Sequence, residues 1–243
     1  MALLEAKDLN VRFGAHHAVV DVSLAVDSGQ IIGLIGPNGA GKTTTFNAVT
    51  GVQTCTGSVH LDGVDISRAP AHRRARLGIN RTFQRLEVFG SMTSYENVLT
   101  AAEITARAHR RPLREAVAVV ADIVELLGLG EIVSQRADAL PTGQARLVEL
   151  GRALATSPKV VLLDEPASGL DEHETAHLAE VLTGLTERGT ALLLVEHDVD
   201  LVMRLCREIY VLDFGQLIAH GTPDDIRGDA KVQDAYLGAV AVA

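Results

Sequence analysis

Asp164 and Glu165 are adjacent carboxylates that follow a run of four apolar residues, Val160–Leu163. Such a run is typical of a buried strand, and ligands of open α/β sheets lie beyond the carboxyl ends of the strands. At that place one carboxylate could hold a metal ion while its neighbour orients or deprotonates a water molecule. Taken alone, an acidic pair at a strand end is as readily a solvated turn, so its meaning depends on the rest of the chain.

A glycine-rich loop at residues 36–43, GPNGAGKT, fits the pattern G-x-x-x-x-G-K-[ST]. It follows the apolar segment Ile31–Ile35 and precedes a segment with helical periodicity, so its N–H groups and the helix N-terminus can bind an anion. Lys42 can reach the β- and γ-phosphates of a nucleotide, and Thr43 can place a hydroxyl on Mg²⁺. The structural alternative is a βα turn without a ligand. We predict a nucleotide site that comprises Gly36, Pro37, Asn38, Gly39, Ala40, Gly41, Lys42, Thr43 and Thr44.

The elements that must position these residues indicate an α/β fold of the P-loop NTPase type. We expect one domain over residues 3–238, with a mainly parallel sheet, an N-terminal antiparallel β subdomain and a helical lobe inserted at about 88–156. The expected strands lie at residues 2–11, 18–26, 30–35, 58–61, 64–66, 159–163, 190–195 and 208–212, and the expected helices at 42–51, two within 94–132, 144–155, 172–187 and 199–206.

The composition argues against several classes of protein. Only 3% of the 243 residues are aromatic and the formal net charge is −9, so a surface that binds nucleic acid is not expected. Cys55 and Cys206 lack metal-type spacing and are interpreted as reduced core thiols of a cytoplasmic protein. The apolar runs are too short to span a bilayer, so a role at the membrane requires a partner.

Six motifs follow one another in the chain, and together they resemble the nucleotide-binding domain of ABC ATPases. The motifs are Gly36–Thr43, Gln84, Leu140–Gln144, Val160–Glu165, Ser168–Asp171 and His197. Three further details resemble the ATPase subunits of branched-chain amino-acid importers. They are the sequence RTFQ at residues 81–84, Pro141 in the signature motif, and the tail AYLG at residues 235–238.

The resemblance implies ATP and Mg²⁺ as cofactors and gives individual residues their roles. Glu165 would activate the attacking water, His197 would contact the γ-phosphate, and Gln84 would contact Mg²⁺ or the water. Thr43, Gln84 and Asp164 would form the metal site. Phe13 would stack on adenine; the alternative is a small core residue of the β subdomain.

The resemblance also implies a second ATPase subunit, identical or homologous, whose nucleotide would be bound by Thr142, Gly143 and Gln144, with Asp171 bridging the subunits. Pro141 and Thr142 replace the serine and first glycine that are usual in this motif, so closure of the dimer is expected to be retained but weaker. Gly143, before a helix expected at 144–155, leaves backbone N–H donors available.

The expected partners are membrane-embedded permease subunits, which would hold the protein at the cytoplasmic face of the membrane; nucleic acid is not expected. The expected cargo is branched-chain or other hydrophobic amino acids. The alternatives are transport of lipid, lipopolysaccharide or another solute such as urea, and a soluble ABC ATPase without a transport role.

Two groups of arginines are interpreted mainly as solvated helical faces, with contact to a membrane-embedded partner or to anionic headgroups as the alternative. They are Arg73, Arg74, Arg76, Arg81 and Arg85, and Arg107, Arg110, Arg111 and Arg114.

Overall fold

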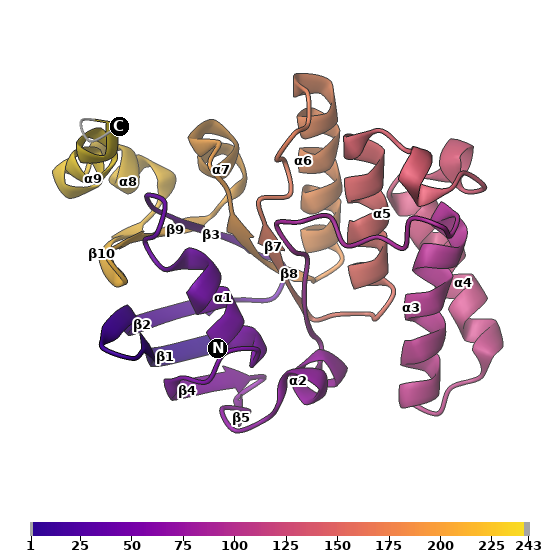
Figure 1. Cartoon of the computed structure of the whole chain (residues 1–243), viewed down its shortest axis with the longest axis horizontal. Coiled ribbons are helices and arrows are strands. Elements are labelled where there is room, and N and C mark those ends of the chain that lie inside the picture. The colour runs from indigo at the N-terminus through magenta and orange to yellow at the C-terminus, as the bar shows by residue number, and fades with distance from the viewer. Residues whose placement is uncertain (1, 241–243) are drawn as a thin grey trace.

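Two β-sheets and nine α-helices make up the computed structural model within the residues that it describes, 2–240, with side chains for residues 2–235 (Figure 1). The strands are β1 Leu4–Phe13, β2 His16–Val26, β3 Ile31–Ile35, β4 Thr56–Leu61, β5 Val64–Asp65, β6 Ile79–Arg81, β7 Val160–Asp164, β8 Ala191–Val195, β9 Glu208–Asp213 and β10 Gln216–Gly221. The helices are α1 Lys42–Thr50, α2 Ala71–Leu77, α3 Ser94–Ala108, α4 Leu113–Leu126, α5 Thr142–Leu154, α6 Glu172–Glu187, α7 Val199–Leu205, α8 Pro223–Gly228 and α9 Ala230–Val240.

The larger sheet has the order β10-β9-β3-β8-β7-β6, and all its neighbouring strands are parallel except β9 and β10. Every residue of β3, β7 and β8 is buried, because both faces of a parallel sheet are covered. Successive side chains of β3 point to opposite faces: Ile31 and Ile35 pack in the same cluster as α6, whereas Ile32 and Leu34 pack against α1 and the smaller sheet. The predicted α/β fold with a mainly parallel sheet is confirmed.

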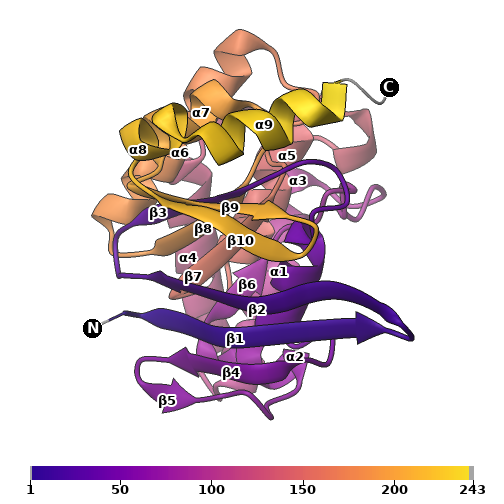
Figure 2. The ribbon, with the colours of Figure 1, turned by 90° about the vertical axis from the view of Figure 1, so that its left-hand side faces the viewer.

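The smaller sheet has the order β2-β1-β4-β5 and is antiparallel throughout. It lies on the side of the larger sheet opposite to α6–α9 (Figure 2). Phe13 pairs with His16 where the chain turns from β1 into β2, so the aromatic ring lies at the exposed tip of this sheet.

Three longer helices, α3, α4 and α5, pack together at the end of the molecule away from the smaller sheet (Figure 1). Helix α3 begins with a capping box between Thr93 and Glu96. Helix α5 begins at Thr142, two residues earlier than the sequence predicts. Proline is well tolerated at a helix start, where its missing N–H would have no partner, and Pro141 accordingly takes the cap position.

Five elements were not predicted: α2, β6, β10, α8 and α9. Helix α2 is rich in arginine and lacks an apolar stripe, and β6 is a three-residue edge strand; neither has a clear period. The predicted tail motif AYLG falls within α9, but the side chains of residues 236–238 lie outside those described.

The interpretation of the first arginine group as a solvated face is wrong for Arg74 and Arg81, which are buried. Arg74 donates hydrogen bonds to the carbonyls of Ala48 (2.9 Å) and Val49 (2.7 Å), at the C-terminal end of α1. Helix ends leave carbonyl groups without intrahelical partners, and Arg74 supplies donors to them. Arg73, Arg76 and Arg85 are exposed, as expected.

Candidate functional site

The glycine-rich loop joins β3 to α1, and close packing requires glycine at two of its positions. Gly36 has φ 150° and Gly41 has φ 103°, in the region that favours glycine. A Cβ atom at Gly36 would collide with the carbonyl oxygen of Leu212, and one at Gly41 would lie 2.6 Å from that of Ala18. The turn between β9 and β10 supports the loop directly, because the N–H of Gly215 donates to the carbonyl of Ala40 at 3.0 Å.

Lys42, the first residue of α1, is folded back over this loop. Its Nζ donates to the carbonyl oxygens of Gly36 (2.6 Å) and Pro37 (3.1 Å). Burial lowers the pKa of Lys42, while the nearby carboxylates Glu165 and Asp164 act in the opposite direction. The ammonium therefore lies at the loop that would surround the phosphates, held by bonds that a more negative ligand can replace.

Asp164 ends β7 and is 1% exposed. One of its oxygens, Oδ2, lies 2.6 Å from Nη2 of Arg81. The other, Oδ1, is buried and has no hydrogen-bond partner among the described residues. A buried acceptor without a donor is costly unless a cation or water completes it, so this oxygen fits the predicted role as a Mg²⁺ ligand. Thr43 is exposed and lines a cavity that Glu165 also lines, so its hydroxyl is open to a ligand in that cavity.

Two of the predicted catalytic residues, His197 and Gln84, contact the third, Glu165. Nε2 of His197 lies 2.7 Å from Glu165 Oε1, and Nε2 of Gln84 donates to Glu165 Oε2 at 2.8 Å. These residues come from three separate places: the segment after β6, the end of β7 and the segment after β8. Glu165 has φ 52°, an uncommon conformation for a residue other than glycine, asparagine or aspartate, and such strain is typical of functional sites.

A cavity of about 390 Å³, here called the phosphate pocket, contains most of the predicted nucleotide-binding residues. Its lining comprises Phe13, His16, Ala18, Asn38, Gly39, Ala40, Gly41, Lys42, Thr43, Thr44, Gln84 and Glu165. Phe13 is 51% exposed, so its alternative interpretation as a core residue is wrong. An exposed ring beside the loop is suited to stacking on a planar base. His16 and Ala18 were not predicted as lining residues.

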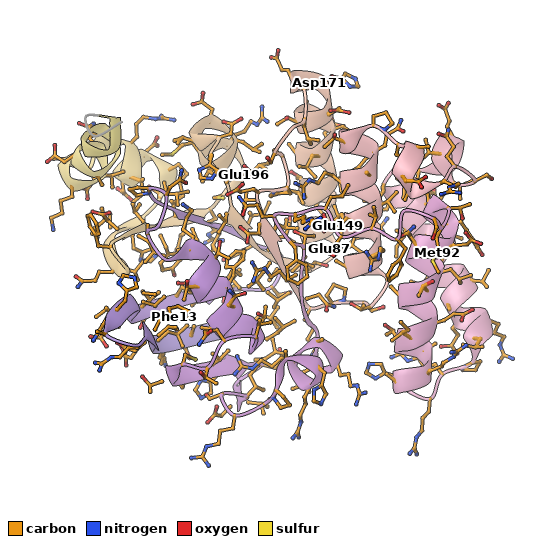
Figure 3. The ribbon with its side chains drawn as sticks, in the orientation of Figure 1. Phe13, Glu87, Met92, Glu149, Asp171 and Glu196 are labelled. Atoms are coloured by element: carbon orange, nitrogen blue, oxygen red, sulfur yellow. The ribbon has the colours of Figure 1, made fainter. Side chains whose placement is uncertain are left out.

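The predicted residues Thr142, Gly143, Gln144 and Asp171 do not line the phosphate pocket. They lie instead where the N-termini of α5 and α6 meet, a region here called the signature corner (residues 140–144 and 168–174). A Cβ atom at Gly143 would collide with the carboxylate of Glu174, and one at Gly169 would lie 3.4 Å from the Thr142 methyl group. Asp171 accepts from the N–H of Glu174 at 2.8 Å and lies at the end of α6, far from Phe13 (Figure 3).

Glu196 is a buried carboxylate at the site that the sequence analysis missed. It accepts hydrogen bonds from the backbone N–H groups of Ala167 (2.6 Å) and His197 (3.2 Å). Burial and the neighbouring Glu165 raise its pKa, and these two hydrogen bonds partly offset that rise. Glu196 thus joins the segment that carries His197 to the loop that leads to the signature corner. In the sequence, its position directly before His197 was the feature that could have indicated that Glu196 belongs to the site.

Arg146 and Glu149 of α5 hold the segment that contains Gln84. Arg146 donates to the carbonyls of Phe83 (3.1 Å) and Gln84 (2.8 Å), and Glu149 accepts from the N–H of Glu87 at 3.2 Å. Glu87 and Glu149 lie beside each other in Figure 3. Helix α5, which begins at the signature corner, is therefore hydrogen-bonded to the backbone of Gln84, whose side chain lines the phosphate pocket.

Comparison with known proteins gives matches over nearly the whole chain. A family model described as ABC transporter matches residues 19–168, and one described as branched-chain amino acid ATP-binding cassette transporter matches residues 216–242. The chain is 41% identical to the high-affinity branched-chain amino acid transport ATP-binding protein BraF of Pseudomonas aeruginosa, over 97% of this chain and 98% of that protein. It is 38% identical to the lipopolysaccharide export system ATP-binding protein LptB of Haemophilus influenzae, over 98% of both.

A solved structure has the same arrangement. The crystal structure of a nucleotide-free ATP-binding cassette from an ABC transporter matches with a TM-score of 0.88 at 30% identity, over 97% of this chain and 99% of that chain. Within residues 2–240, no helix is long and apolar enough to cross a membrane.

Proposed function

Because the chain belongs to the ATP-binding family of ABC transporters, we propose that it hydrolyses MgATP to drive a separate membrane permease for branched-chain or other hydrophobic amino acids. The observation that carries this proposal is the position of Glu165. It lies beside the phosphate pocket and is held from both sides, by His197 and by Gln84. A carboxylate oriented in this way can accept a proton from water.

The chain's own residues have separate tasks in the proposed reaction. Lys42 and the loop N–H groups hold the phosphates, Phe13 holds the base, and Gln84 orients the water whose proton Glu165 accepts. His197 steadies the charge that develops on the γ-phosphate. Asp164, Thr43 and Gln84 would hold Mg²⁺, which supplies positive charge to the phosphate oxygens when bound.

A second subunit is required in this proposal because the signature corner lies away from the phosphate pocket of its own chain. The N-terminus of α5 has exposed Thr142 beside it, and the partial positive charge of a helix N-terminus favours a phosphate. We propose that this end of α5 faces the nucleotide of an identical or homologous subunit, with Asp171 at the contact. Residues 3–238 would act as one ATPase domain that includes a helical lobe at about 88–156.

A hollow surface between α2 and α3 supports docking of the permease. Two adjoining hollows of about 190 and 260 Å³ share Asn80 and Thr156 in their linings. Around them, Phe83 is 45% exposed and Ile104 is 62% exposed. Exposed apolar side chains that border a groove are typical of an interface with another protein. A permease segment bound there would place the chain at the cytoplasmic face of the membrane.

The cargo is proposed from the relatives. BraF is named for branched-chain amino-acid transport, and the match at residues 216–242 is to a model of the same description. LptB is named for lipopolysaccharide export, so transport of a lipid is the second candidate. Solute uptake in a strain that lacks this gene, measured with leucine, isoleucine and valine, tests the first. Normal uptake together with co-purification of a permease that exports lipid would support the second instead.

A further inference from the structure

Arg81 is buried beside the carboxylate that would hold the metal ion. Its side chain is 6% exposed, and its Nη2 lies 2.6 Å from Oδ2 of Asp164. Its Nη1 donates to Oδ1 of Asn47 in α1 at 2.5 Å. The guanidinium carbon also lies 5.6 Å from the ring centroid of Phe46 and 5.1 Å from that of Phe83. Hydrogen bonds in the plane and aromatic rings nearby fix this guanidinium in one position.

The ion pair changes the charge that a metal ion would meet. The ammonium of Lys42 lies near two carboxylates, Asp164 and Glu165, and the guanidinium of Arg81 is paired with Asp164. The formal charge of these four groups is zero. A buried carboxylate without a partner attracts a cation strongly, but one already paired with arginine does so much less. Phosphate groups that enter the pocket restore negative charge.

We propose that Arg81 is a positioning residue that neutralises Asp164 and prevents the site from retaining a divalent cation before nucleotide arrives. It occupies Oδ2 and leaves only Oδ1 of Asp164 for the metal. This inference rests on the function proposed above and deepens it, because it makes metal binding depend on the nucleotide. Arg81 belongs to the same short segment as Gln84, so the metal carboxylate and the water-orienting amide are positioned together.

The test is a titration of the nucleotide-free protein with Mn²⁺, with free Mn²⁺ followed by electron paramagnetic resonance. Arg81→Met keeps a long side chain near the rings of Phe46 and Phe83 but removes the charge. It should bind Mn²⁺ about tenfold more tightly than the wild type, since one unit of positive charge has been lost beside the carboxylate. Arg81→Lys keeps the charge and should retain weak, wild-type binding.

Two matched controls test whether loss of any surface charge, or of any buried arginine, would tighten Mn²⁺ binding equally. Arg85→Met removes the same charge from the exposed surface, and Arg74→Met removes a buried arginine that is bonded to α1 carbonyls. Both should bind Mn²⁺ as the wild type does. Equal affinity of the wild type and Arg81→Met would overturn the proposal, as would equal tightening by Arg85→Met.

Thermal melting shows whether each variant is folded. If Arg81→Met does not fold, Arg81→Gln gives the same comparison, because it is also neutral but keeps a donor for Asp164. The ATPase rate of the wild type is measured separately. A wild type that does not hydrolyse ATP rejects the proposed function, whereas the Mn²⁺ affinities alone decide the role of Arg81.

Discussion

The phosphate pocket and the signature corner are built differently, although both would contact the γ-phosphate of a nucleotide. At the phosphate pocket, His197 and Gln84 each contact Glu165, and Gln84 and Glu165 line the open cavity. At the signature corner, the acidic side chains Asp171 and Glu174 bond to the start of their own helix α6. The first region is arranged for chemistry within one chain. The signature corner presents the N-terminus of α5, which would bind a nucleotide only when a second subunit supplies it.

The Glu165→Gln variant should show the largest effect, because it removes the carboxylate that both His197 and Gln84 contact. The amide cannot accept the proton, so we expect hydrolysis to fall by roughly a thousandfold while ATP binding is retained. The dimer should accumulate with ATP, which size-exclusion chromatography would detect. Glu180→Gln, at an exposed position in α6 outside the signature corner, is the control. A normal rate in Glu165→Gln would remove this residue from the role of base.

Gly143→Ala should give the next largest effect and tests the signature corner. The added methyl group would collide with Glu174, so we expect the ATPase rate to fall by about a hundredfold with nucleotide binding to the monomer preserved. An aspartate at this position would combine that collision with charge repulsion, so alanine is the sharper change.

The double variant Gly143→Ala/Glu174→Ala separates two causes of the loss. Recovery of at least part of the rate would mean that Gly143 is needed to accommodate Glu174. No recovery would mean that Gly143 itself must approach the partner's nucleotide. Wild-type activity in Gly143→Ala alone would contradict the proposed role of this corner.

Phe13→Ala should have a smaller effect, limited to nucleotide affinity. Loss of a stacked ring is worth about 1 kcal/mol, so the KM for ATP should rise roughly fivefold while kcat changes little. Phe13→Tyr keeps the ring and should behave as the wild type. A fall in kcat without a change in KM would show that the ring does not hold the base.

Glu196→Gln should have the smallest effect, on the pH dependence of stability. Burial raises the pKa of Glu196 above its ordinary value, so the folded state holds the proton more tightly than the unfolded state does. The free energy of unfolding therefore falls as pH rises from the ordinary pKa through the raised one. Glutamine cannot titrate, so urea unfolding at pH 5 and pH 7.5 should show a smaller slope in the variant. The change is at most about 1.4 kcal/mol per pH unit. An unchanged slope would contradict this origin of the pH dependence.

Local patterns were sufficient to predict much of the fold and of the phosphate pocket. The loop at residues 36–43 combines a fixed spacing with a strand before it and a helix after it. The runs of β3, β7 and β8 are apolar at every or nearly every position because both faces of the parallel sheet are covered. The family resemblance drawn from six ordered motifs is confirmed by the matching family model and relatives.

Contacts between distant segments could not be predicted. Arg81 was interpreted with its exposed neighbours because it belongs to an arginine-rich stretch, and its partner Asp164 is 83 residues away. The closeness of Glu174 to Gly143 depends on where two helices meet. Glu196 has an ordinary sequence neighbourhood, and only the fold reveals that it is 5% exposed. Burial and pairing of charged side chains depend on tertiary packing, which periodicity does not encode.

The contact between the β9–β10 turn and the glycine-rich loop bears on how the chain is divided. Gly215 supports Ala40, and the carbonyl of Leu212 limits the space at Gly36, although more than 170 residues separate these partners. A fragment that ends after α7 would carry all six motifs from Gly36 to His197 but would lack the turn that packs against the glycine-rich loop. The β9–β10 turn is thus a structural component of the ATP-binding site, and the smallest chain that folds this site extends beyond His197.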